Sequence, residues 1–339
     1  MNMQGIYIYG FVENDCIADI KNILLESGIY SIEYNEISAV VTDTKINKLE
    51  YLNKEELAHL LVDHQLKIEK IMTSGCSKVI PMQLGTVVSS GNDVMKILIN
   101  GYNILKETFE IIDEVEEIDI VAVWSNFLDV IKDISDSPQI KLMKENINKK
   151  SLYDQNDSIS IGKAIKEKID QKNSKACIDI VNSLMPFCLD ARKHESMNDE
   201  MPLNYAFLVK KEESGTFIEM IDQLDIKYAD KINFKIVGPL PCYSFYTIES
   251  KAIKKEDIEN AKKILGIDLS DDNYNLKKAY RSKASITHPD KNSENVSDSS
   301  ENFIESNNAY KLLIDYSSIL KQSPDNLSNE PFYVVKIKN

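Results

Sequence analysis

The sequence has 339 residues and a formal net charge of -14, with 43% hydrophobic and 28% charged residues, which is the composition of a folded chain of two or three domains. A chain this acidic repels phosphate backbones and anionic lipid heads, so neither nucleic acid nor a membrane is an expected partner. No run of about 18 apolar residues predicts a membrane span, and the N-terminus lacks the features of a secretory signal, so we expect a cytoplasmic protein.

Neither the cysteines nor any known catalytic motif in the sequence indicates a reaction or a metal site. The five cysteines are scattered, without a CxxC pair, at Cys16, Cys76, Cys177, Cys188 and Cys242. In a reducing compartment they are expected to be reduced, mostly buried thiols. The sequence has no Walker loop, no GxGxxG, no HExxH and no Cys/His cluster with metal spacing, so it predicts no enzyme, no metal and no cofactor.

Residues 1–130 predict an α+β domain that opens β-α-β-β. The expected elements are a strand over 6–12, a helix over 17–27 capped by Gly28, and strands over 29–34 and 37–44 that turn at Asn35. A helix over 54–74 follows, and His64 on its apolar stripe is expected to be a hydrogen-bonded core residue. Pro81 places the strand over 78–88 at a sheet edge or a bulge. A helix over 92–115 and a strand over 118–125 close the domain.

Residues 131–160 are polar and are interpreted as a linker or a frayed helix. The second α+β domain is expected over 161–249. It begins with a helix over 161–195 that Pro186 breaks, with His194 solvated at a helix end. A strand over 203–209, a helix over 212–228, and strands over 232–238 and 242–248 repeat the β-α-β-β order.

Several segments, taken in order, resemble the GvpL/GvpF family of gas vesicle proteins over residues 1–249. They are the opening GIYIYGFV, the helix with His64 followed by VIPMQLGTV, the strand LNYAFLV, and GPLPCYSF at 238–245. Gln83 departs from the arginine that is frequent in the family. The resemblance implies a part in building or lining the gas-filled protein shell, in contact with the small shell protein and other gas vesicle proteins, and it implies no reaction.

A charged stretch over 249–256 is interpreted as a short linker, and residues 257–320 have helical periodicity. Lys277, Lys278, Arg281 and Lys283 place four cations on about two helical turns, which inverts the local sign of an acidic chain. Proline in His288-Pro289-Asp290 removes an N–H group and disfavours helical angles in the preceding residue, so the helix is expected to end there. The final segment, 321–339, is a tail that contains a possible strand, PFYVVKIK.

LKKAYRSKASITHPDKN over 276–292, ILGI over 264–267 and FIESNNAYKLL over 303–313 resemble three parts of a DnaJ-type J domain in the correct order. The resemblance implies docking to a DnaK-type chaperone. Lys277, Lys278 and Arg281 would meet an acidic surface of that chaperone, and His288, Pro289 and Asp290 would promote its ATP hydrolysis. Four positions depart from the usual pattern, and they leave the activity of the J domain open: Lys283, Ser285, Thr287 and Ser306.

Together these observations predict an α+β fold of two ferredoxin-like domains followed by a small all-α J domain. The predicted function is an accessory role in gas vesicle assembly, in which the chain binds the shell subunit and recruits a DnaK-type chaperone at the vesicle. Two alternatives stay open, namely a J-domain adaptor for an unrelated client and a minor structural component of the vesicle wall.

Overall fold

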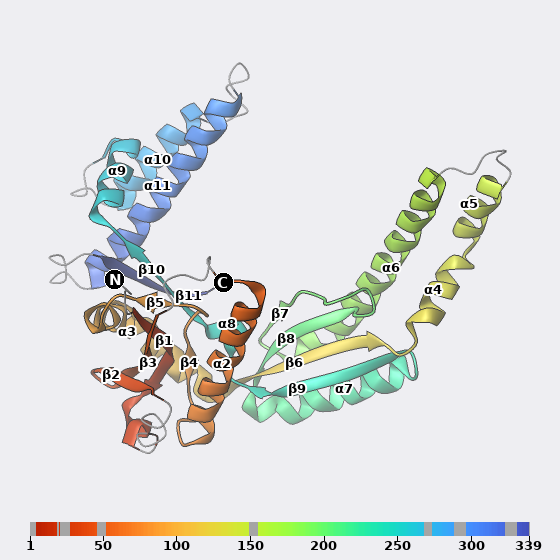
Figure 1. Cartoon of the computed structure of the whole chain (residues 1–339), viewed down its shortest axis with the longest axis horizontal. Helices are drawn as coiled ribbons and strands as arrows, with labels where there is room; N and C mark the ends of the chain where they lie inside the picture. Colours follow the sequence, from red (N-terminus) through yellow and green to blue (C-terminus); the bar gives the residue numbers. More distant parts are fainter. Residues whose placement is uncertain are drawn as a thin grey trace. The chain divides into compact units, whose positions relative to one another are not determined.

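The computed structural model describes residues 5–18, 20, 28–45, 52–148, 155–267, 273–287, 296–322 and 331–338. The fold is α+β with antiparallel sheets and a C-terminal helical region, as the sequence predicted. The chain forms two compact units. Unit 1 combines residues 1–110 with 246–339, and unit 2 comprises residues 111–245. Figure 1 shows the helices and strands of both units.

The sheet of unit 1 has the ferredoxin-like strand order β2-β3-β1-β4, with β5 also paired to β1. Its strands are β1 (Gly5–Glu13), β2 (Tyr30–Tyr34), β3 (Ile37–Thr44), β4 (Ile80–Pro81) and β5 (Val87–Val88). Asn35 has a φ of 51° in the turn between β2 and β3, as the sequence predicted. Pro81 lies in the edge strand β4, where its missing N–H costs the sheet no ladder hydrogen bond.

Two helices accompany this sheet, α2 (Lys54–Thr73) and α3 (Gly91–Glu114). A capping box between Asn53 and Glu56 begins α2. His64 on α2 is buried and hydrogen-bonded to the Tyr7 hydroxyl at 2.8 Å, which confirms the predicted core histidine. The helix predicted over 17–27 lies mostly outside the described residues.

Unit 2 repeats the ferredoxin-like order as β7-β8-β6-β9. Its strands are β6 (Val115–Trp124), β7 (Asp190–Lys193), β8 (Leu203–Lys210) and β9 (Ile232–Leu240), and its long helices are α6 (Gln155–Leu184) and α7 (Ser214–Tyr228). The strand predicted to close the first domain is therefore the central strand β6 of this second sheet. A core that includes Phe207, Phe217 and Ile221 lies under it.

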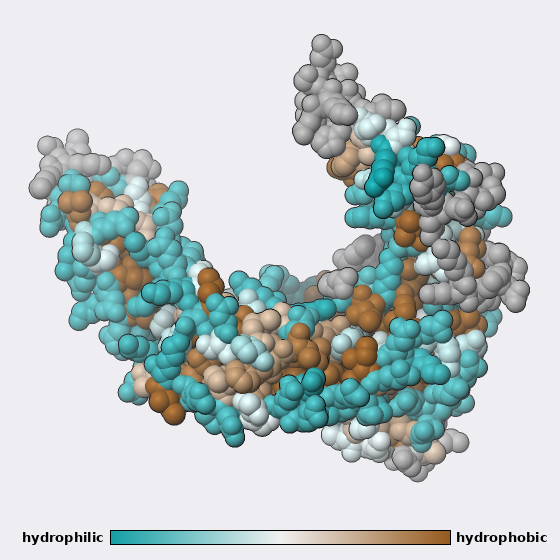
Figure 2. Space-filling view, turned by 180° about the vertical axis from the view of Figure 1, so that it is seen from behind, coloured by the Kyte–Doolittle hydropathy of each residue, from teal (hydrophilic) through white to brown (hydrophobic). Residues whose placement is uncertain are grey.

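The polar segment 131–160, predicted as a linker or a frayed helix, is largely helical where the structure describes it. It contributes to α4 (Phe127–Ser135) and α5 (Pro138–Asn148), and α6 begins at Gln155. Val130, Ile134 and Ile140 are buried in the core of unit 2, so tertiary packing overrides the polar composition. In Figure 2 this helical hairpin, at the left of the view, has a mostly hydrophilic surface with scattered apolar patches.

Two further expectations in unit 2 need correction. The helix α6 ends at Leu184, directly before the η3 turn (Met185–Phe187) that contains Pro186, and β7 follows where helix was predicted to continue. The strand predicted over 242–248 is instead the short helix α8 (Tyr243–Tyr246). Tyr243, Ser244 and Phe245 therefore follow a turn of helix, and their side chains do not alternate as in a strand.

The C-terminal helices are α9 (Lys255–Leu265), α10 (Asn273–Thr287) and α11 (Val296–Gln322). The predicted linker 249–256 is mostly strand β10 (Ile248–Ile253), which pairs antiparallel with β11 (Phe332–Ile337), the strand of the tail. Ile253, Phe332 and Val334 join the core of these three helices, which explains why the charged stretch is ordered.

The β10–β11 ribbon also contacts the N-terminal part of unit 1. The backbone N–H of Gln83 donates to Ile248 O at 2.7 Å, and the Asn100 side chain on α3 donates to Tyr333 O at 2.8 Å. The three-helix region is thus attached to the N-terminal part of unit 1 through both of its flanking strands (Figure 1).

The prediction of five reduced cysteines is wrong for two of them. Cys16 and Cys76 form a disulfide with a Cα–Cα distance of 5.1 Å, while Cys177, Cys188 and Cys242 are free thiols. The pair lies 60 residues apart in sequence, so spacing alone gave no signal for it. Strand pairing brings the two ends together, because Cys16 follows β1 and Cys76 precedes β4, the neighbour of β1 in the sheet.

Candidate functional sites

The helix α10 presents a basic face to solvent. Leu276 is buried, and the Tyr280 ring stacks on Tyr310 of α11 with ring centroids 4.4 Å apart. These contacts orient α10, because residues four apart lie on the same side of a helix. Lys277, Lys278 and Arg281 are exposed. The predicted cations therefore form one accessible cluster, which we call the α10 basic face.

The departures from the J-domain pattern have specific structural outcomes. Lys283 and Ser285 are exposed, so neither places a polar group in the helix core. Ser306 is buried at 1% exposure, and its hydroxyl donates to Asn302 O one turn earlier at 2.7 Å. A buried hydroxyl that keeps a hydrogen bond avoids most of the cost of desolvation. The side chain of Thr287 lies outside the described residues.

The described part of helix α10 extends to Thr287, and the end of the helix at the His288-Pro289-Asp290 segment stays a prediction. His288, Pro289 and Asp290 lie outside the described residues, so their part in chaperone docking stays a prediction.

Unit 2 contains a polar cluster that the sequence analysis missed. The Ser244 hydroxyl donates to Glu117 Oε1 at 2.7 Å, and the Ser244 backbone N–H donates to Glu117 Oε2 at 2.8 Å. His194 Nε2 lies 3.0 Å from the same hydroxyl, and the Arg192 guanidinium donates to Ser244 O. The short helix α8 is thereby held in place by Glu117 of β6, Arg192 of β7 and His194, which follows β7.

Burial raises the pKa of Glu117 to about 7, although the hydrogen bonds from Ser244 oppose this shift. Burial also raises the pKa of Asp119, which lies on the same face of β6 two residues later, and His194 acts in the opposite direction. A carboxyl group with a raised pKa in a cleft can act as a general acid or base. Here the Ser244 hydroxyl donates its proton to a carboxylate, so it is engaged as a donor and the cluster is best explained as the anchor of α8.

His194 was expected to be solvated at a helix end. It instead follows β7, is half-buried, and its backbone N–H donates to Asn204 O at 2.8 Å. The segment GPLPCYSF was the available signal, since it contains Ser244 and was part of the first resemblance. Its partner Glu117 lies 127 residues earlier, and pairing at that distance has no local sequence pattern.

Within the described part of the chain, no group of three or more His, Cys, Asp or Glu side chains is placed to hold a metal ion. No helix there is long and apolar enough to cross a membrane.

Comparison with protein families gives two matches. The family described as gas vesicle synthesis protein GvpL/GvpF matches residues 5–247, and the DnaJ domain matches residues 262–320. The α10 basic face falls within the second match, and the Glu117–Ser244 cluster falls within the first.

Related proteins and structures agree with the first match. The chain is 24% identical over 192 residues to gas vesicle protein F of Dolichospermum flosaquae, covering 56% of this chain and 78% of that protein. It is 21% identical over 255 residues to gas vesicle protein F1 of Halobacterium salinarum, covering 75% of this chain and 98% of that protein.

The crystal structure of the gas vesicle protein GvpF from Anabaena sp. PCC7120 superposes with a TM-score of 0.53 and 19% identity, covering 71% of this chain and 97% of that one. The corresponding structure from Microcystis aeruginosa has a TM-score of 0.52 at 19% identity and covers 71% of this chain and 98% of that one. Both likenesses establish a shared fold.

Proposed function

The chain belongs to the gas vesicle synthesis protein GvpL/GvpF family and carries a DnaJ domain, and we propose that it binds the vesicle shell subunit during assembly and recruits a DnaK-type chaperone. The chaperone would hydrolyse ATP, so the proposal needs no catalytic residue in this chain. The proposed place of action is the cytoplasm at the growing vesicle, with other gas vesicle proteins as further partners and without nucleic acid or membrane.

The observation that carries the proposal is the presence of both families on one chain. A subunit that must pack into a gas-facing shell exposes apolar surface before assembly, and such surface aggregates readily. A protein that holds this subunit and also carries a J domain would bring a chaperone to it. The α10 basic face supports the second half of the proposal, because three exposed cations on an acidic chain favour an acidic partner surface.

The test compares hosts that carry the complete gas vesicle gene cluster with the wild-type gene, a deletion of this gene, or the His288→Gln variant. Flotation and electron microscopy measure vesicle formation, and circular dichroism of purified His288→Gln confirms its fold. We expect the deletion to abolish vesicles and His288→Gln to impair them.

The other outcomes of this test contradict either chaperone recruitment or the assembly role itself. If the deletion abolishes vesicles and His288→Gln does not affect them, recruitment of the chaperone is wrong. If all three hosts float alike, the assembly role is wrong. Shell-subunit binding is tested separately by pull-down with purified shell protein, and no retention would contradict it.

A further inference from the structure

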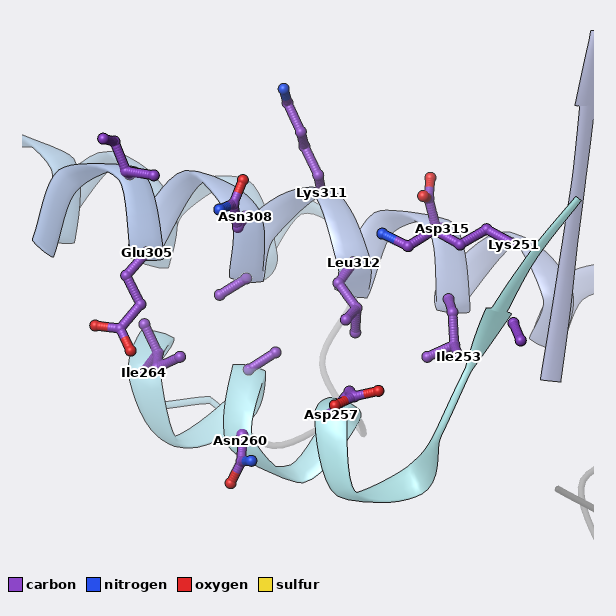
Figure 3. A pocket seen from close by; sticks show the side chains of 14 residues that line it. Lys251, Ile253, Asp257, Asn260, Ile264, Glu305, Asn308, Lys311, Leu312 and Asp315 are labelled. Atoms are coloured by element: carbon purple, nitrogen blue, oxygen red, sulfur yellow. The ribbon is translucent and has the colours of Figure 1, made fainter. Parts of the chain in front are cut away.

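A groove of about 800 Å³ lies between α9 and α11, beside β10. Ala261 and Ala309 are buried where the two helices meet, and these small side chains leave a hollow between larger neighbours. Figure 3 shows Ile264, Leu312 and Ile253 directed toward this hollow. The groove lies apart from the α10 basic face, whose cations do not line it.

Beyond Ile248, which forms a bridge with Met82, the strand β10 borders the groove with an edge that no described strand covers. Lys338 N donates to Thr247 O at 2.7 Å, so alternate residues from Thr247 onward bond to β11. The intervening residues of β10 direct their N–H and C=O groups to the edge opposite β11. Ile248 shows this, because its carbonyl oxygen accepts a hydrogen bond from Gln83 N. By this register Ser250 and Ala252 present their N–H and C=O groups on the open edge. An open edge of this kind can pair with an added strand.

The charges around the groove favour a basic ligand. Figure 3 shows Glu305 reaching from α11 toward α9 and Asp257 on the α9 side, whereas Lys311 points away from the groove. Glu305 has no ion-pair partner among the described residues. Lys251 lies at the other end beside Asp315, which already binds Lys336.

From these features we propose that the open edge of β10 and the α9–α11 groove bind an extended segment of a partner protein. The segment adds an antiparallel or parallel strand to β10 through Ser250 and Ala252. Its alternate side chains, which all point to one face, are apolar and fill the space lined by Ile264 and Leu312. A lysine or arginine among them lies beside Glu305. This gives the J domain a second binding surface, independent of chaperone docking.

The experiment measures fluorescence anisotropy of a labelled peptide, Val-Ser-Val-Ser-Lys-Ser-Val-Ser-Val, titrated with the full chain. We expect saturable binding, weakened about tenfold or more when the peptide lysine is replaced by glutamate. The Glu305→Lys variant should weaken binding of the lysine peptide by about tenfold, whereas Glu259→Lys, an equal charge change on α9 outside the groove, should leave it within about twofold.

A second variant tests the strand edge. Ser250→Pro removes an N–H that points away from β11, so the β10–β11 ladder is retained and peptide binding is lost. Stimulation of a DnaK-type ATPase should be unchanged in Ser250→Pro and Glu305→Lys, which separates this surface from the proposed chaperone docking. The proposal is overturned if the wild-type chain does not bind the peptide, or if Glu305→Lys and Ser250→Pro bind it as the wild type does.

Discussion

Several buried polar side chains in both units are held by specific partners. The Tyr7 hydroxyl accepts a hydrogen bond from Gly85 N–H at 3.2 Å and lies 2.8 Å from His64 Nδ1, with which it is also hydrogen-bonded. Burial lowers the pKa of His64 to about 4, so the imidazole is neutral at pH 7. Because buried polar groups without partners are costly, such pairs define which residues can be changed without unfolding the protein.

Removing the Tyr7 hydroxyl should destabilise unit 1. In Tyr7→Phe both His64 Nδ1 and Gly85 N–H lose a buried partner, and we expect the free energy of unfolding to fall by about 1–3 kcal/mol. Tyr30→Phe removes a hydroxyl whose bond to Asp43 is exposed, and it should cost under about 0.5 kcal/mol. Urea denaturation measures both variants, and equal effects would contradict this account of the Tyr7–His64 pair.

The His64 imidazole should make stability depend on pH in a defined window. Its pKa is lowered from 6.5 to about 4 in the folded chain, so between these values the unfolded chain binds the extra proton. The free energy of unfolding therefore falls as pH decreases from 6.5 to 4, by at most about 3 kcal/mol from this residue. The difference between wild type and His64→Gln isolates this contribution from the carboxylates. A difference that stays constant across the window would show that His64 titrates normally.

The elements divide into those that sequence patterns identify and those that depend on distant contacts. Alternation and turn chemistry predicted β1, β2, β3 and β8 well, because their signals are local. The strand β10 was missed since its residues are charged, and only pairing with β11 and packing in the helix core order it. The helices α4 and α5 were predicted only as a linker or a frayed helix for the same reason, as their few apolar residues face a core built by distant segments.

The contact between β11 and α3 can be tested with two helical glycines. A Cβ at Gly101 would lie 2.8 Å from Val335 Cγ1, so Gly101→Ala should push β11 from α3 and destabilise the chain by about 1–3 kcal/mol. Gly162 on α6 has nothing within 4 Å of such a Cβ, so Gly162→Ala should stabilise by about 0.5–1 kcal/mol. Thermal unfolding compares the two variants, and we expect their changes in stability to have opposite signs.

At the scale of the whole molecule, the order of motifs predicted both families, while the pairing of segments required the structure. The α10 basic face was predictable because its signal is a local inversion of charge. The Glu117–Ser244 cluster was not, since its residues come from β6, the β7 region and α8. The attachment of the J-domain region at both ends could not be predicted either, because the paired residues of β10 and β11 lie 79 to 89 positions apart in the chain. Patterns therefore identified what each segment resembles, and contacts showed how the segments are joined.

The α10 basic face should control chaperone stimulation through charge. Replacing both Lys278 and Arg281 with glutamate reverses the sign of an exposed surface that contributes little to the helix core, so the fold should be retained. We expect this variant to reduce stimulation of a DnaK-type ATPase by about tenfold or more at low salt. Lys263→Glu on α9 changes another exposed cation and should have little effect on this stimulation.

Added salt should reduce the ATPase stimulation by the wild-type chain toward that of the double variant, because screening acts on exposed charges. Stimulation that is insensitive to both salt and the double substitution would place the docking surface elsewhere on the J domain.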